Sequence, residues 1–336
     1  MPGRRAAVKL TGAAIVGAAA LLIGGSWRAH TPLWAGARFS AADYQRAQRR
    51  GLFFLYAAAR RPDTFREWGH DLLSAFVNIA STNANREVSD LAWRMGHERA
   101  GEWRRLNREI PANADADDLA NLVYGSDAAE ALGVHDRHLH DALMRTASRF
   151  STADYLGFDP LREPPPANGR YETFQDALIG AYTFDHYGIP IGAHYADVLH
   201  WLPAMHPYPA RGSGLYYRSV YTITHVVYTY NGYNQYRVAP ECFPEEFAYL
   251  NANFEHAIVD NDAETLGEYL DTLQAFGLTW ADPRMRRAVE FLLTAQNPDG
   301  SWGNPKESDA YTRYHSTWTA LDGVQRYRNR AVLPCP

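Results

Sequence analysis

Apolar residues recur at helical spacing along most of this 336-residue chain. Val88, Leu91, Ala92 and Met95, for example, follow the pattern of a helix that buries one face. We find no convincing run of alternating apolar and polar residues of the kind that predicts a β-strand. The pattern therefore predicts an all-α protein of roughly a dozen helices, joined by short turns into stacked helical hairpins.

Helix ends are marked by local signals. Ser40 with Asp43 predicts an N-cap for a helix that reaches about residue 60, and Asp262 predicts a second N-cap. Gly188 predicts the end of a third helix, and Gly277 follows the helix that Asp262 begins. The apolar face of that helix consists of Leu266, Tyr269, Leu270, Leu273 and Phe276.

Residues 287–302 read as the end of a helix followed by a tight turn. Pro298 cannot continue a helix, and Gly300 tolerates the positive φ that such a turn requires. The amide of Gln296 is suited to bind exposed backbone at the helix end, and Trp302 is suited to cover the turn. We expect these two side chains to hold the turn in place.

The same segment resembles the QW motif of squalene-hopene cyclases, oxidosqualene cyclases and related prenyltransferase-like proteins. The matching residues are Arg287, Ala288, Phe291, Leu292, Gln296, Gly300 and Trp302. The resemblance implies the terpenoid-cyclase-like fold, an (α/α)6 toroid of helical hairpins, formed here by one domain over residues 38–336. In that superfamily the motif is structural, so it implies a fold rather than a reaction.

An internal repeat agrees with this architecture. Residues 50–59 align without gaps on residues 287–296, with basic, small, aromatic and aliphatic positions in common. If the hairpins close into a ring, the first and last units meet. The repeat therefore predicts contact between these two segments.

Residues 1–37 are interpreted as a targeting segment. Arg4 and Arg5 precede an apolar run over residues 10–25, and no acidic residue occurs before Asp43. One interpretation is a cleaved export signal peptide, which resembles a Tat signal and has a cleavage site at residues 35–37. The other is a retained membrane anchor with interfacial tryptophans. Both predict an extracytoplasmic protein.

Charge and cysteine content exclude some classes of function. The net charge is −5 and the basic residues are scattered, so no nucleic-acid partner is expected. Cys242 and Cys335 are the only cysteines, and their spacing is not that of a zinc site. Whether they pair is left open by the sequence.

An acidic run is the first candidate for chemistry. Asp115, Asp117 and Asp118 resemble the DxDD motif of class II terpene cyclases, although Leu119 stands where that family commonly has threonine. The resemblance implies that Asp117 protonates an alkene and that its two neighbours tune its acidity. The alternative is that these acids cap the helix that follows.

The second candidate is His315, together with Tyr311 and Trp318. This segment resembles both the helix after the QW motif in cyclases and the Tyr-His segment of protein prenyltransferase β subunits. Those subunits bind zinc through an additional Asp-x-Cys pair, which this chain lacks, so no metal is expected. The three residues are predicted to bind substrate; the alternative is a histidine hydrogen-bonded to the preceding turn.

The third candidate is His225, beside a run of polar residues: Tyr228, Tyr230, Asn231, Tyr233, Asn234 and Tyr236. Of these, Tyr228 is predicted to bind substrate together with His315, Tyr311 and Trp318. Buried hydroxyl and amide groups need partners, so this density suggests a polar ligand. His225 with a tyrosine would act as base and acid on a uronic sugar. An ordinary hydrated junction between helix and loop explains the residues equally well.

Histidines 135, 138 and 140 form a fourth group beside Asp136 and Asp141. Their spacing does not place all three on one helix face, so we interpret them as a solvated helix start rather than a metal site.

The leading functional hypothesis is a terpene-cyclase-like enzyme. It would cyclise or isomerise a hydrophobic isoprenoid substrate in the toroid cavity by acid initiation, without a cofactor, and would associate with a membrane through residues 10–25. Two alternatives remain: an exported binding or scaffolding toroid without catalysis, and a secreted polysaccharide lyase or hydrolase that uses His225.

Overall fold

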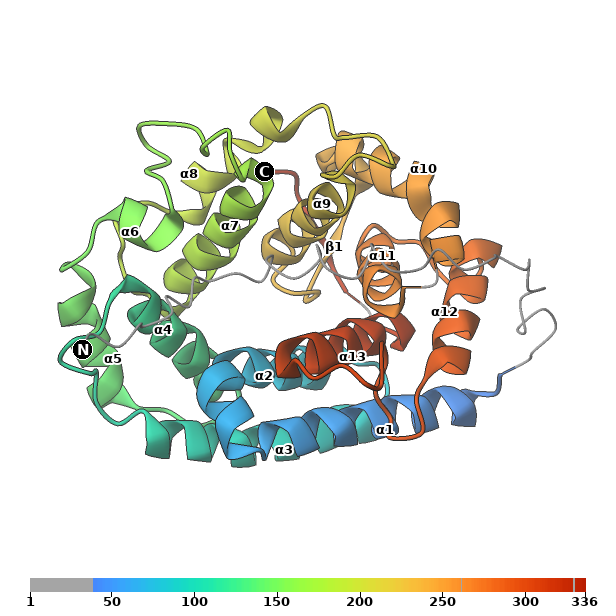
Figure 1. The fold of residues 1–336 in the computed structure, drawn as a ribbon, viewed down its shortest axis with the longest axis horizontal. Helices are drawn as coiled ribbons and strands as arrows, with labels where there is room; N and C mark the ends of the chain where they lie inside the picture. Colours follow the sequence, from blue (N-terminus) through green and yellow to red (C-terminus); the bar gives the residue numbers. More distant parts are fainter. Residues whose placement is uncertain (1–38, 261, 329) are drawn as a thin grey trace. The chain divides into compact units, whose positions relative to one another are not determined.

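The computed structural model describes residues 39–260, 262–328 and 330–336, and 66% of these residues are helical (Figure 1). Strand within these residues is limited to one short parallel pair, so the all-α prediction is confirmed. The predicted export signal or anchor lies outside the described residues. None of the helices that are described is long and apolar enough to cross a membrane.

Contacts group the described residues into two compact units. Unit 1 contains residues 104–127 and 135–226, and unit 2 contains residues 39–103, 128–134 and 227–336 without 261 and 329. The boundary falls within three helices: α3 (Arg86–Leu106), α4 (Ala116–Ala131) and α9 (Tyr216–Tyr230).

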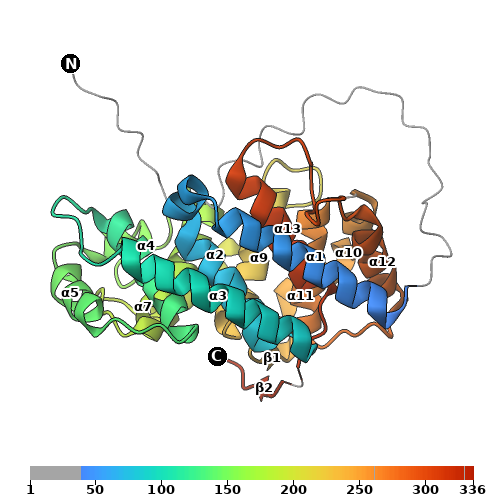
Figure 2. The same cartoon turned by 90° about the horizontal axis from the view of Figure 1, so that it is seen from below.

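Unit 2 contains most of the long helices and the strand pair (Figures 1 and 2). Its elements are α1 (Ala41–Ala59), α2 (Pro62–Thr82), α3 (Arg86–Leu106), the short helix η2 (Pro240–Cys242), α10 (Pro244–Asp260), α11 (Ala263–Ala275), α12 (Pro283–Ala295), α13 (Ala310–Val324), β1 (Arg237–Val238) and β2 (Val332–Leu333); the last three residues of α3 belong to unit 1. Ser40 and Asp43 form a complete capping box at α1, and Asp262 caps α11, as predicted.

Helix α13 is central to the packing of unit 2, where it lies against α11 and α1 (Figure 1). Its approach to α11 is unusually close, because a Cβ added to Gly267 would lie 2.3 Å from the carbonyl oxygen of Thr319. Every residue of α11 except Glu264 is buried. The apolar face predicted for this helix is therefore confirmed, but the opposite face is buried as well.

The turn after α12 connects the C-terminal part of unit 2 to α1, its first helix. Nε2 of Gln296 donates to the carbonyl oxygens of Ala47 on α1 (2.9 Å) and Gly300 (3.0 Å). Trp302 is fully buried and donates from Nε1 to the carbonyl oxygen of Leu292 at 2.6 Å. Gly300 has a φ of +92°. The contact between the two repeated segments is confirmed, since α1 packs on α12 and α13.

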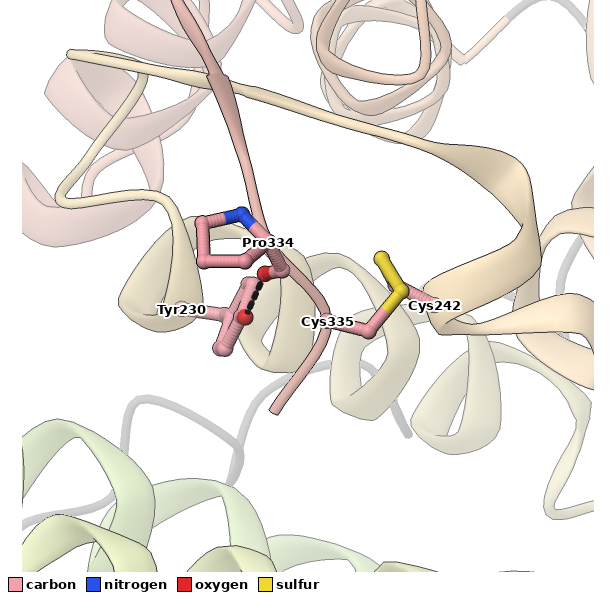
Figure 3. Close-up of a disulfide and its surroundings, with 4 residues drawn as sticks. All are labelled: Tyr230, Cys242, Pro334 and Cys335. Atoms are coloured by element: carbon pink, nitrogen blue, oxygen red, sulfur yellow. Dashed lines mark hydrogen bonds between the residues drawn. A yellow bond between two sulfur atoms is a disulfide. The ribbon is translucent and has the colours of Figure 1, made fainter.

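The C-terminal segment is fastened to the same unit. Cys242 and Cys335 form a disulfide, and the hydroxyl of Tyr230 donates to the carbonyl oxygen of Pro334 (Figure 3). Strands β1 and β2 pair in parallel beside this bridge, with Arg237 opposite Val332. These contacts fix the position of the segment that follows α13.

Unit 1 is built around α4, α7 and α9. Its elements are the first part of α4, α5 (Arg137–Ala147), α6 (Thr152–Leu156), α7 (Arg170–Tyr187), α8 (Tyr195–Leu199), the short helix η1 (Leu202–Met205) and the first part of α9. Gly188 ends α7 in the left-handed conformation, as predicted. Phe174, Leu178 and Ala181 on α7 are fully buried and form part of its core.

Candidate active site: two groups of acidic side chains

Two of the three aspartates in the acidic run cap α4. Oδ1 of Asp115 accepts the N–H of Asp118 at 2.9 Å, and Oδ2 of Asp118 accepts the N–H of Asp115 at 3.3 Å. Both side chains are exposed. The capping interpretation is therefore confirmed for these two residues, and their charge lies at the positive end of the helix dipole.

Asp117 differs from its neighbours because it is partly buried. Burial raises its pKa above the ordinary value, and the charges of Asp115 and Asp118 raise it further. Asp176 on α7 faces the same region, and burial together with the charge of Asp117 raises its pKa to about 7. We call these two residues the carboxyl pair.

A tyrosine completes this arrangement. Tyr124, also on α4, has its pKa raised by burial and then by the charges of Asp176 and Asp117. Asp117, Asn121 and Tyr124 follow one another at i, i+4 and i+7 and are all partly buried, so they form a polar stripe on one helix face. That spacing was the available signal for the stripe. Asp176 itself lies 59 positions away in the sequence, and no local pattern links it to Asp117.

In unit 2, His315 pairs with a glutamate that the sequence analysis did not single out. Its Nδ1 lies 2.9 Å from Oε1 of Glu264 on α11, and Oγ of Ser316 donates to Oε2 of the same glutamate at 2.7 Å. Burial opposes the charged imidazole, but Glu264 outweighs it and raises the pKa of His315 to about 9. The alternative that His315 bonds to the preceding turn is wrong, because the neighbouring α11 supplies the stronger partner.

Three further carboxylates lie buried close by, and we call Glu268, Asp271 and Asp322 the acid cluster. Burial is the main cause that raises the pKa of Asp271, to about 7, and it raises the pKa of Asp322 well above the ordinary range. The charge of Glu268 raises both values further. One oxygen of Glu268 is buried without a hydrogen-bond partner among the described residues.

Amide groups surround the acid cluster. Nδ2 of Asn78 donates to Asp322 at 2.9 Å, and Nδ2 of Asn234 donates to Asp271 at 2.7 Å. Nε2 of Gln325 donates to Asp322 at 3.1 Å. The cluster is therefore a buried polar network. Leaving one of its groups without a hydrogen-bond partner would cost free energy of folding.

The residues predicted to bind substrate border this interior. Tyr311 stacks on His315 with ring centroids 4.9 Å apart, and Trp318 meets the same imidazole edge-on at 6.1 Å. Tyr228 is buried, and its hydroxyl donates to the carbonyl oxygen of Glu268 at 3.3 Å. All four residues lie in unit 2, whereas Asp117 and His225 lie in unit 1.

His225 is partly buried on α9 and interacts with its own helix. Its Nδ1 lies 2.8 Å from the carbonyl oxygen of Tyr221 and 3.3 Å from Oγ1 of Thr224. This geometry is typical of a histidine that makes hydrogen bonds within its own helix. The contacts occupy Nδ1, so Nδ1 is not available to act as the base.

The polar residues after Tyr228 form a turn. Oδ1 of Asn231 accepts the N–H of Asn234 at 2.7 Å, and Tyr233 and Asn234 both have positive φ. Tyr236 is exposed, while Tyr230 holds the C-terminal segment. The density of Tyr and Asn in this run is thus largely explained by turn formation and by Asn234's bond to the acid cluster.

The histidines before α5 behave as a helix start. Oδ1 of Asp136 accepts the N–H of Leu139 and caps the helix, and His135 and His138 are exposed. Nε2 of His140 lies 3.2 Å from the carbonyl oxygen of Tyr187. In the part of the chain that the structure describes, no three His, Cys, Asp or Glu side chains come together as metal ligands.

Comparison with protein-family profiles, curated proteins and solved structures finds no match for this chain.

The residues that sequence reasoning missed share one feature. Glu264, Glu268 and Asp271 lie at i, i+4 and i+7 on α11, so they form an acidic stripe on a helix whose other face is apolar. In the sequence, such a stripe is typical of the solvent-exposed face of a helix. Only the packing of α13 against α11 shows that these carboxylates lie in the interior.

Proposed function

We propose that this protein is an acid–base enzyme in which the carboxyl pair supplies the proton. The feature that carries the proposal is the buried position of Asp176 near Asp117, which raises the pKa of Asp176 to about 7. A pair of this kind retains one proton near neutral pH, and that proton belongs to the pair rather than to either residue. Asp176 then holds the proton, which its burial retains and the negative charge of Asp117 retains further.

The chemistry expected of this pair is general acid catalysis. When substrate takes the proton from Asp176, the new carboxylate lies beside that of Asp117, and the repulsion between them favours reprotonation as the reaction completes. Asp115 and Asp118 add to the effect, since their charges raise the pKa of Asp117. In this proposal Asp176 is the general acid, and Asp117 is the neighbouring carboxylate that raises the pKa of Asp176.

The substrate class rests on the resemblance to terpenoid cyclases. We propose that the hairpins form an (α/α)6 toroid, an assignment supported by the contact of α1 with α12 and α13 and by the bonds of Gln296. An isoprenoid chain is the substrate that this resemblance implies. The alternative of an exported binding or scaffolding toroid makes no use of the carboxyl pair.

A turnover assay tests the proposal. The full-length protein is incubated with squalene and shorter prenyl substrates, and in parallel with neutral and uronic oligosaccharides. Asp117→Asn and Asp176→Asn are compared with Asp154→Asn, which removes one charge at an exposed helix cap of the same unit. We expect a loss of about 100-fold or more in both pair variants, the size expected for removal of a general acid, and little change in the control.

Two results would count against the proposal. Full activity in Asp176→Asn would remove the pair from the reaction. Absence of product from any substrate by the folded protein would favour the binding toroid.

The acid cluster favours a second candidate, a glycan lyase or hydrolase. Asn78, Asn234 and Gln325 offer amides to carboxylates beside the aromatic side chains of Tyr311 and Trp318. Carboxylates, amides and aromatic rings match a sugar better than a polyene, which has no groups to pair with them. In this candidate the acid cluster replaces His225 as the reactive group, and turnover of an oligosaccharide lost in Asp322→Asn would establish it.

A further inference from the structure

A cavity of about 520 Å³ in unit 2 lies between the turn after α11 and the segment that follows α13. Four arginines line it: Arg237, Arg326, Arg328 and Arg330. None of its lining residues is an aspartate or a glutamate. The cavity therefore presents hydrogen-bond donors and positive charge without a carboxylate to neutralise them.

Two of these arginines are held rigidly by backbone oxygens. Nη2 of Arg330 donates to the carbonyl oxygen of Gln274 at 3.0 Å, and Nε of Arg328 donates to the carbonyl oxygen of Asn83 at 3.0 Å. Burial and the nearby charge of Arg237 lower the pKa of Arg330 to about 10, against the opposing effect of Asp271. Asp271 lies outside the lining, and its oxygens accept from Tyr327 and Asn234.

The other two arginines have no ion-pair or hydrogen-bond partner for their guanidinium groups among the described residues. Arg326 stacks on Trp280, with its guanidinium carbon 4.3 Å from the ring centroid. Tyr44 also packs against Trp280, with ring centroids 4.7 Å apart. Stacking holds the Arg326 guanidinium at the cavity while leaving its N–H groups available.

Two neutral donors in the lining also lack partners. Nε2 of Gln274 and Nε1 of Trp280 are buried, and neither finds an acceptor in the part of the chain that is described. The Gln274 side chain belongs to a residue only 8% exposed. A buried donor without an acceptor costs about 1–3 kcal/mol, and these two nitrogens add unpaired polar groups to the wall of the cavity.

We propose that this cavity binds a small organic oxyanion that carries at least two negative charges, either as phosphate or as carboxylate groups. Guanidinium groups recognise both kinds of oxygen through paired, charge-assisted hydrogen bonds. The volume suits a metabolite-sized ligand rather than a bare ion. The site contains none of the residues of the carboxyl pair, so it stands independently of the proposed reaction.

Calorimetric titration of the full-length protein tests this site. Pyrophosphate and citrate serve as probes, with the ionic strength held constant by potassium chloride. We expect at least one probe to bind with a Kd of about 10–100 μM and each of Arg326→Gln and Arg237→Gln to weaken binding about tenfold or more. The probe that binds more tightly tells phosphate from carboxylate ligands.

Arg66→Gln is the matched control. It also removes one positive charge from unit 2, but Arg66 is exposed and pairs only with exposed Asp63 on α2. Binding in this variant should equal that of the unchanged protein. Thermal transitions check that the two cavity variants are folded. The proposal is overturned if neither probe binds more tightly than chloride. It is also overturned if Arg66→Gln weakens binding as much as the two cavity variants do.

Discussion

Nδ1 of His315 on α13 lies 2.9 Å from Oε1 of Glu264 on α11, with both side chains largely withdrawn from water. The contact joins two helices whose packing dominates unit 2. It also places a protonated imidazole beside the buried acid cluster, where Glu268 and Asp71 add to its stabilisation.

This pair predicts a dependence of stability on alkaline pH. The pKa of His315 is about 9 in the folded protein and about 6.5 when unfolded, so the stabilisation is complete below pH 6.5 and is lost as the pH rises through 9. We expect His315→Gln to cost about 2–3 kcal/mol in the free energy of unfolding at pH 6 and much less at pH 9.5. Urea titrations at both values measure the difference, and an equal cost at both would contradict the assigned ion pair.

Asp176 predicts that stability also falls with rising pH, over a lower pH range, but here removing the side chain is expected to stabilise the protein. Its folded pKa of about 7 exceeds the unfolded value of 3.8, so ionisation favours the unfolded chain as the pH rises from 4 to 7. Asp176→Asn should therefore be about as stable as the wild type at pH 4 and about 4 kcal/mol more stable at pH 8.

Asp154→Asn provides the comparison for this prediction. Hydrogen bonds from Ser151 lower the pKa of Asp154, so removing its charge should give no stabilisation at pH 8. If Asp176→Asn is destabilised at pH 8, the carboxyl pair does not oppose folding as described here.

The close approach of α11 and α13 predicts that Gly267 tolerates no side chain. A Cβ at this position would meet the backbone of Thr319 at 2.3 Å, and backbone cannot move aside as a side chain can. We expect Gly267→Ala to cost about 3 kcal/mol or more in unfolding free energy.

Gly101→Ala is the matched variant. Gly101 is exposed on α3 and a Cβ there would meet nothing within 4 Å, so the change should stabilise the protein by up to about 1 kcal/mol. Similar effects in the two variants would mean that the α11–α13 crossing is looser than the structure has it.

The disulfide predicts a measurable loss on reduction. Cys242 and Cys335 are 93 residues apart, and closing a loop of this length stabilises a folded chain by about 2–4 kcal/mol. Cys335→Ser should lower the urea midpoint by a corresponding amount and remove the effect of added reductant. A reductant effect that persists in Cys335→Ser would show that the bridge is not its cause.

Sequence reasoning succeeded where the determining interactions are local. The capping box of Ser40 and Asp43, the N-cap Asp262 and the left-handed Gly188 each depend on residues within one helical turn. Gln296 was also anticipated to bind backbone, although its acceptor Ala47 is 249 positions away. The hydrogen-bonding capacity of the glutamine amide predicted a bond to backbone, but it did not identify Ala47 as the acceptor.

The candidate site could be predicted only in part, because its contacts join residues that are far apart in the sequence. Asp117 was singled out, but Asp176, which gives it a proposed function, comes from another helix and has no local signature. The alternative interpretation of His315 gave it the preceding turn as its partner, whereas α11 supplies Glu264. Which helices face one another is decided by packing, and only that choice turns the acidic stripe of α11 into an interior.

The most direct test of the account is the titration of the Asp176 carboxyl by carbon-13 NMR in the full-length protein and in Asp117→Asn. The account predicts an apparent pKa near 7 in the wild type and a lower value in Asp117→Asn, because the charge that holds the proton is gone. A carboxyl that titrates near 4 in both proteins would contradict the claim that the pair carries a proton at neutral pH.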